Sequence, residues 1–308
     1  MSIRVAIAGA TGNLGTPILQ ALLNAGLSVT VLSRMDSSSS KLTPHPHLTI
    51  KEVDFGSIAS LAPAMHGVEV VVSCVATMAI GGQNSLIDAS IAAGVKRFIP
   101  AEFGMDSANT LAMQLPVCAP KAATQRYLAQ KALSNPGFTW TAIANGLFLD
   151  WGLKMGLILN VAEHTATLYN GGNVPFSATN LADVARAVLG VISHREQTAN
   201  RIVYVHSARV TQNQLIRYAR EKDGKPWNTT IKDTGEVQRE SMAELAKGLE
   251  ADVDAAMLGF CFCGSFNSEY GCDFSEHLDN ELLDIKELHD TELKAMIQNV
   301  HYDTVSVR

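Results

Sequence analysis

The sequence contains no block of basic residues and no long uninterrupted apolar run, and these absences restrict the classes of protein that fit it. Its formal net charge is −6, so neither nucleic acid nor an anionic membrane surface is an expected partner. The longest apolar stretch, residues 68–80, is interrupted by polar side chains and is too short to span a bilayer. The first residues lack the charged and long apolar segments of a secretory signal, so a cytoplasmic protein is expected.

Metal-ligand spacings are also missing. The nine histidines are scattered and form no His-Glu-x-x-His motif. Cys261 and Cys263, with Cys272 and His277, suggest zinc, but structural zinc sites favour Cys-x₂₋₄-Cys pairs. We therefore expect no metal, and we expect the five cysteines to be reduced thiols.

The sequence does contain enough apolar residues for a large buried core. Of the 308 residues, 47% are hydrophobic and only 18% are charged, which excludes a disordered chain. This length predicts two domains, or one large domain with an added lobe.

A buried strand, a glycine turn and a helix follow one another at the start of the chain. In such a turn Gly9 permits a tight bend, Gly12 lets the backbone approach a diphosphate, and Gly15 lets helix and strand pack closely. The spacing is Gly-x-x-Gly-x-x-Gly, so three glycines in an ordinary loop are the alternative. A second strand at 28–33 completes a βαβ unit and favours a dinucleotide site, with contacts expected from Gly9, Thr11, Gly12, Asn13, Leu14 and Gly15.

The end of that second strand indicates which dinucleotide binds. Arg34 stands where an acidic residue would bind the ribose 2′-hydroxyl of NAD. Arg34, with Lys41 beyond a serine-rich loop, could bind a 2′-phosphate instead, which favours NADP(H). The alternative is that both are solvated surface cations.

Strands and helices continue to alternate, which predicts an α/β fold with a Rossmann-type doubly wound parallel sheet and a smaller C-terminal substrate lobe. The dinucleotide-binding domain is expected at 1–147 and the substrate lobe mainly at 148–308, with segments near 176–206 returning to the first domain. Residues 146–151 are predicted as a loop, and 165–176 as a hairpin around Asn170-Gly-Gly172.

The run Lys96-Arg-Phe-Ile-Pro-Ala-Glu-Phe-Gly104, after the glycine turn and the helix that begins at Gln83, resembles the NmrA-like and isoflavone-reductase-like proteins, atypical members of the short-chain dehydrogenase/reductase superfamily. The Pro-x-Glu-Phe-Gly block is the distinctive part, and the resemblance covers about the first 220 residues. It implies further cofactor contacts from Val75, Ala76, Gln83, Glu102, Phe103, Lys121, Asn145 and Leu147. For the substrate it suggests Met78, Phe103, Phe148, Trp151 and Met155, although such apolar residues are more often plain core.

The resemblance also implies that Lys121 is the catalytic residue. Ordinary short-chain dehydrogenases use Tyr-x-x-x-Lys; if Lys121 is that lysine, Val117 stands at the tyrosine position. Lys121 then remains as the acid/base group. The rival is a literal Tyr127-x-x-x-Lys131, six residues further along the helix, and a third interpretation makes Lys121 a solvated first-turn lysine.

These expectations combine into an NADPH-dependent reductase of a small aromatic or conjugated substrate, phenolic or enone-like. The nicotinamide supplies hydride and Lys121 handles the proton. The alternatives are an NmrA-type NADP-binding redox sensor without turnover and an isomerase or dehydratase on the same scaffold. The expected partner is a small-molecule substrate, and a homodimer is left open.

Overall fold

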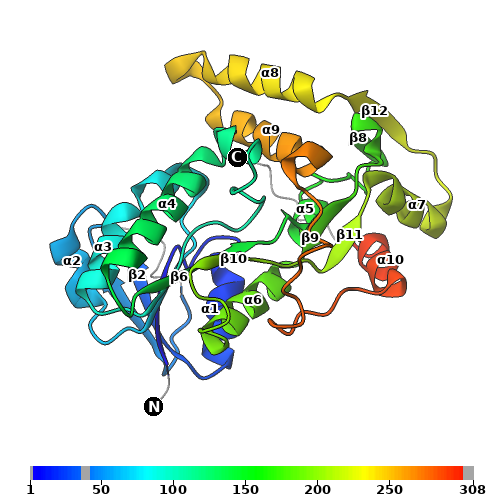
Figure 1. The fold of residues 1–308 in the computed structure, drawn as a ribbon. Helices are drawn as coiled ribbons and strands as arrows, with labels where there is room; N and C mark the ends of the chain where they lie inside the picture. Colours follow the sequence, from blue (N-terminus) through cyan, green and yellow to red (C-terminus); the bar gives the residue numbers. More distant parts are fainter. Residues whose placement is uncertain (1–2, 36–41, 301–308) are drawn as a thin grey trace.

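A computed structural model describes residues 3–35 and 42–300, and the predicted Rossmann-type α/β fold is confirmed (Figure 1). One sheet has the strand order β10-β6-β5-β4-β1-β2-β3, and every neighbouring pair in it is parallel. Its strands are β1 (Arg4–Ala8), β2 (Ser28–Ser33), β3 (Leu48–Glu52), β4 (Val70–Ser73), β5 (Arg97–Ile99), β6 (Thr139–Ala144) and β10 (Arg201–Tyr204).

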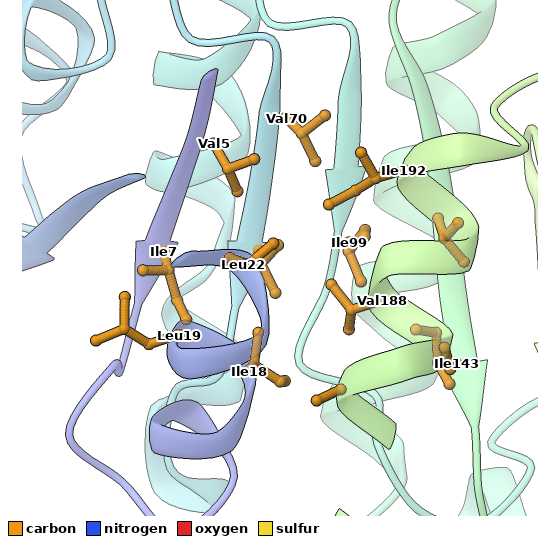
Figure 2. Packing of buried hydrophobic residues seen from close by; sticks show 14 of the residues in the cluster. Val5, Ile7, Ile18, Leu19, Leu22, Val70, Ile99, Ile143, Val188 and Ile192 are labelled. Carbon is orange, nitrogen blue, oxygen red and sulfur yellow. The ribbon is translucent and has the colours of Figure 1, made fainter. Parts of the chain in front are cut away.

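Helices cover both faces of this sheet because successive strand residues point to opposite sides. Val5 and Ile7 of β1 pack under α1 (Gly15–Asn24) and α6 (Leu181–Ser193), as Figure 2 shows. The alternate residues of β1, Ala6 and Ala8, face the other layer. That layer consists of α2 (Ile58–Ala64), α3 (Asn84–Ala92) and α4 (Ala119–Ser134).

The rest of the described chain adds two small sheets and five further α-helices around a second core. The sheet β11-β9-β7 consists of Ala208–Val210, Phe176–Thr179 and Leu147–Phe148, and the sheet β12-β8 of Asn228–Lys232 and Thr165–Tyr169. The helices are α5 (Leu149–Lys154), α7 (Gln212–Asp223), α8 (Thr234–Leu245), α9 (Val253–Ser265) and α10 (Asp290–Gln298). Helices α8 and α9 lie side by side at one end of the molecule (Figure 1).

The predicted hairpin at 165–176 is wrong. Its first strand, β8, pairs in parallel with β12, whereas its second, β9, belongs to the other small sheet. The turn between them does not fold the second strand back onto the first. Instead, the Asn170 side chain donates to the hydroxyl of Thr234 and to the carbonyl oxygen of Phe266. The predicted loop 146–151 is also wrong: it contains β7, which pairs with β9, and the start of α5.

The strand β10 enters the large sheet from beyond the predicted boundary at residue 147 and pairs with β6. The division into domains stays a prediction. Over residues 3–35 and 42–300, no helix has the length and apolar character that crossing a membrane requires.

Candidate active site

The glycine turn lies where β1 ends and α1 begins, and its three glycines serve different purposes. A Cβ on Gly9, whose φ is +81°, would overlap the carbonyl oxygen of Cys74 after β4. A Cβ on Gly15 would overlap the carbonyl oxygen of Gly9. A Cβ on Gly12 would meet only the Gly9 oxygen at 3.5 Å, an ordinary contact. The fold therefore requires Gly9 and Gly15, but the chain itself gives no reason for glycine at 12.

The turn is open toward solvent. Thr11, Gly12 and Asn13 are exposed, and Leu14, at the N-cap of α1, gives the helix no side-chain cap. Uncapped N–H groups at a helix start are a common anion site in proteins, and here the Thr16 N–H already donates to the Gly12 carbonyl oxygen while Pro17 has no N–H. Arg34 is exposed at the end of β2, and Lys41 lies outside the described residues.

Buried polar atoms without hydrogen-bond partners collect at the carboxyl ends of the strands. In the part of the chain that the structure describes, such atoms are few, and three of them end or follow β4, β5 and β6 of the large sheet: Ser73 Oγ, Glu102 Oε1 and Asn145 Oδ1. A fourth, Asn180 Oδ1, follows β9 of a small sheet. Buried polar atoms are normally paired, so unpaired ones need an explanation. This edge is where ligands bind in doubly wound folds, and a polar ligand would supply the partners.

The segment after β4 forms one wall of this edge. Val75 is half-buried, and Ala76 is exposed just before a 3₁₀ helix, Thr77–Gly82, that carries the exposed Met78. Gln83 is buried, and its side-chain oxygen accepts from the Ala101 N–H at 3.0 Å. Gln83 thereby holds the loop after β5 in place.

Lys121 lies in the first turn of α4, yet only 7% of its surface is exposed. Its Nζ donates to the main-chain carbonyl oxygen of Glu102. The interpretation of Lys121 as a solvated lysine is therefore wrong. Gly104 leaves room for this amine, since a Cβ there would lie 3.2 Å from Nζ.

Tyr127 and Lys131, the alternative catalytic pair, contact helix α3 instead. The Tyr127 hydroxyl donates to Asp88 of α3 at 2.8 Å, and Lys131 lies 2.6 Å from the same carboxylate. Burial, and then Asp88, raises the pKa of Tyr127. Tyr127 and Lys131 thus join α4 to α3, and the structure does not bring them to the strand ends.

The proposed substrate residues are only partly brought together. Phe148 and Trp151 make an edge-to-face contact with ring centroids 6.4 Å apart. Phe103, Leu147 and Met155 are half-buried, and Phe103 packs against the core beneath α1 and α6. Asn145 is fully buried after β6, and its main-chain N–H donates to the carbonyl oxygen of Gly104.

Sequence reasoning missed the neighbours that α9 brings to Lys121. The charge of Lys121 acts on Cys118 and on Cys261, which lies on α9. Burial raises the pKa of Cys118 to about 12, so its thiol is neutral near pH 7. No local motif signals that residue 261 returns to this helix. Residues 3–35 and 42–300 contain no group of three or more His, Cys, Asp or Glu side chains that could hold a metal ion.

Comparison with known proteins identifies the family and the fold of this chain. Residues 1–263 match the model of the NmrA-like family. Oxidoreductase aprR of Aspergillus flavus is 34% identical over 289 residues, which cover 92% of this chain and 95% of the relative. Oxidoreductase poxI of Penicillium oxalicum is 33% identical over 263 residues, or 84% and 80% of the two chains.

Solved structures show the same fold at low identity. The pinoresinol-lariciresinol and phenylcoumaran benzylic ether reductase structures match with a TM-score of 0.76 at 18% identity, over 98% of this chain and 100% of theirs. AtPrR2, solved with NADP⁺ and (+)-pinoresinol, matches with a TM-score of 0.69 at 21% identity, over 97% and 98%. Because the family model spans residues 1–263 of 308, the chain belongs to the NmrA-like family, which confirms the resemblance read from its glycine turn and its Pro-x-Glu-Phe-Gly block.

Proposed function

We propose that this protein is an oxidoreductase that uses NADPH to reduce a small aromatic or conjugated substrate. The names of its relatives support the reaction class, since aprR and poxI are oxidoreductases and a maize relative, 27% identical, is an isoflavone reductase homolog. The AtPrR2 complex contains NADP⁺, which supports the choice of cofactor.

The observation that carries the proposal is the glycine at position 12. Gly9 and Gly15 are explained by backbone atoms of the chain, and Gly12 is not. A close approach of diphosphate to the backbone explains it. In this arrangement the turn from Gly9 to Gly15 holds the diphosphate, Arg34 binds the 2′-phosphate, and the strand ends near Val75, Phe103 and Asn145 receive the nicotinamide.

Replacing Gly12 by Ala tests this assignment. The new methyl group meets only an ordinary contact inside the protein, so the free energy of unfolding measured in urea should stay within about 0.5 kcal/mol of the wild type. NADPH binding, measured by calorimetry, should weaken at least tenfold because the methyl group occupies the space of the diphosphate. Gly15→Ala is the matched control and should destabilise the fold. Unchanged NADPH affinity in Gly12→Ala would contradict a dinucleotide at this turn.

The choice between NADPH and NADH depends on Arg34. Replacing Arg34 by Ala should remove a charge-assisted contact of about 1.5–3 kcal/mol, roughly a ten- to hundredfold loss of NADPH affinity. NADH affinity should hardly change, because NADH has no 2′-phosphate. Calorimetric titration of both cofactors checks this. Equal losses for the two, or a wild-type preference for NADH, would refute the assignment.

Lys121 provides the acid/base group. NADPH, when bound, supplies the hydride, and the Lys121 ammonium donates a proton to the substrate oxygen on which negative charge develops. Met78, Phe103, Phe148, Trp151 and Met155 would form the apolar wall against which an aromatic ring packs. Screening phenolic and enone compounds for loss of NADPH absorbance tests the substrate class. Tight NADPH binding with no turnover would favour the sensor, and product formation without net NADPH consumption would favour an isomerase or dehydratase.

A further inference from the structure

Glu102, the acidic residue of the Pro-x-Glu-Phe-Gly block, has an unusual environment. Only 2% of its surface is exposed. One carboxyl oxygen, Oε2, accepts from the Gln125 side chain at 3.0 Å, and the other, Oε1, is buried without a partner. The Gln125 amide is fixed by a second bond, which it donates to the buried hydroxyl of Ser107 at 2.7 Å. The Ser107 hydroxyl also interacts with the carboxyl group, but a buried carboxyl group with one unpaired oxygen is costly, so a role beyond packing is needed to explain it.

The same residue holds Lys121 through its main chain. Lys121 and Gln125 lie one turn apart on α4 and therefore share a face of the helix. The Lys121 amine donates to the Glu102 carbonyl oxygen, while the Gln125 amide donates to the Glu102 carboxyl group. One helix face thus binds both the backbone and the side chain of a single residue. Gly104 completes the arrangement by leaving space beside the amine.

The charges of the two residues are coupled. Burial raises the pKa of the Glu102 carboxyl group, and the Lys121 ammonium is the largest influence that opposes this rise. The nearby thiols of Cys118 and Cys261 add no negative charge at neutral pH, because burial raises the pKa of both. Other titratable groups whose charges act on this cluster are Asp106, Cys118, Tyr204 and Cys261. Burial raises the pKa of Tyr204 as well, so Asp106 is the remaining charged neighbour.

We propose that Glu102 is the positioning residue of Lys121: its carbonyl oxygen orients the amine, and its buried carboxyl group, held by Gln125 on the same helix face, is electrostatically coupled to that amine. This inference rests on the proposed role of Lys121 as proton donor. Glu102 therefore keeps the amine of Lys121 in one place beside the loop after β5.

The test follows the titration of the Glu102 carboxyl carbon by NMR in protein labelled with [5-¹³C]glutamate, without cofactor or substrate. The Glu102 signal is assigned by its absence in Glu102→Gln. In Lys121→Met the titration midpoint of Glu102 should rise by about one pH unit or more, because the opposing positive charge is gone. Lys121→Arg keeps the charge and should hold the midpoint closer to the wild-type value.

Asp106→Asn is the matched control, since it removes the other nearby carboxylate. Asp106 raises the pKa of Glu102, so this variant should move the midpoint in the opposite direction, downward. Equal Glu102 midpoints in the wild type and Lys121→Met would overturn the proposal. A raised midpoint together with unchanged turnover in Lys121→Met would uphold the pairing of the two residues and contradict only the proposed role of Lys121 in the reaction.

Discussion

Replacing Lys121 by Met should slow turnover by about 10² to 10⁴, the range that general acid–base catalysis contributes. Methionine keeps much of the apolar stem but has no proton to give. Because the lysine is buried and bonded to the Glu102 carbonyl oxygen, its loss should leave the diphosphate turn untouched. The measurement is kcat with a confirmed phenolic or enone substrate at saturating NADPH, after calorimetry shows that the variant binds NADPH normally.

Tyr127→Phe is the control for this experiment. Its hydroxyl bonds Asp88 between two helices, so its removal should cost little activity. If Tyr127→Phe were inactive while Lys121→Met kept near wild-type turnover, the Tyr127-x-x-x-Lys131 interpretation would be correct and the placement of the active site on α4 wrong.

Replacing Arg97 by Met should destabilise the fold by about 2–4 kcal/mol. Arg97, at the start of β5, is 1% exposed and donates to the hydroxyls of Thr139, Thr141 and Thr198 and to the carbonyl oxygen of Arg195. Each hydroxyl already donates its own proton to a carbonyl oxygen, so none can compensate by turning. Hydrogen bonds to a charged group contribute about 1.5–3 kcal/mol each, and removal of a buried charge offsets part of the loss.

Urea unfolding followed by circular dichroism measures this change. Arg220→Met, at an exposed position on α7, is the control and should stay within about 0.5 kcal/mol of the wild type. NADPH affinity of folded Arg97→Met should be unchanged, because Arg97 lies at the amino end of its strand and the proposed ligand edge lies at the carboxyl ends. A stability loss no larger than that of Arg220→Met would show that the buried network contributes nothing net.

The Rossmann-type sheet was predictable because local patterns encode it. Apolar runs and glycines predict a strand, a glycine turn and a helix at the start of the chain and a second strand at 28–33, and the structure has β1, α1 and β2 there. The hairpin failed for the opposite reason: β8 finds its partner strand some sixty residues later in β12, and nothing between 165 and 176 records that pairing. Asn170 and the two following glycines form a turn, but the direction of the chain after it depends on the contacts of Asn170 with Thr234 and Phe266.

In the candidate site, too, some features could be predicted from the sequence and others depend on contacts between distant segments. The glycine turn was predicted from a local pattern, and Lys121 from the resemblance to a family. The burial of Lys121, its bond to Glu102 and the nearness of Cys261 depend on how α4, the loop after β5 and α9 meet, which no single stretch specifies. Arg97 carried a signal that was not used, since an arginine inside a strand buried on both faces needs acceptors.

Because β10 is an edge strand that comes late in the sequence, the large sheet cannot be completed early during synthesis. On the ribosome, β6 emerges with one side unpaired and must wait for residues 201–204 before its last neighbour exists. Arg97 also lacks part of its hydrogen bonding until then, because two of its four acceptors belong to residues 195 and 198. A nascent chain that ends near residue 147 therefore holds an open strand edge and a half-satisfied buried cation. The sheet that carries the proposed cofactor site is complete only after residue 204 has been made, so we expect folding of this unit to wait for β10.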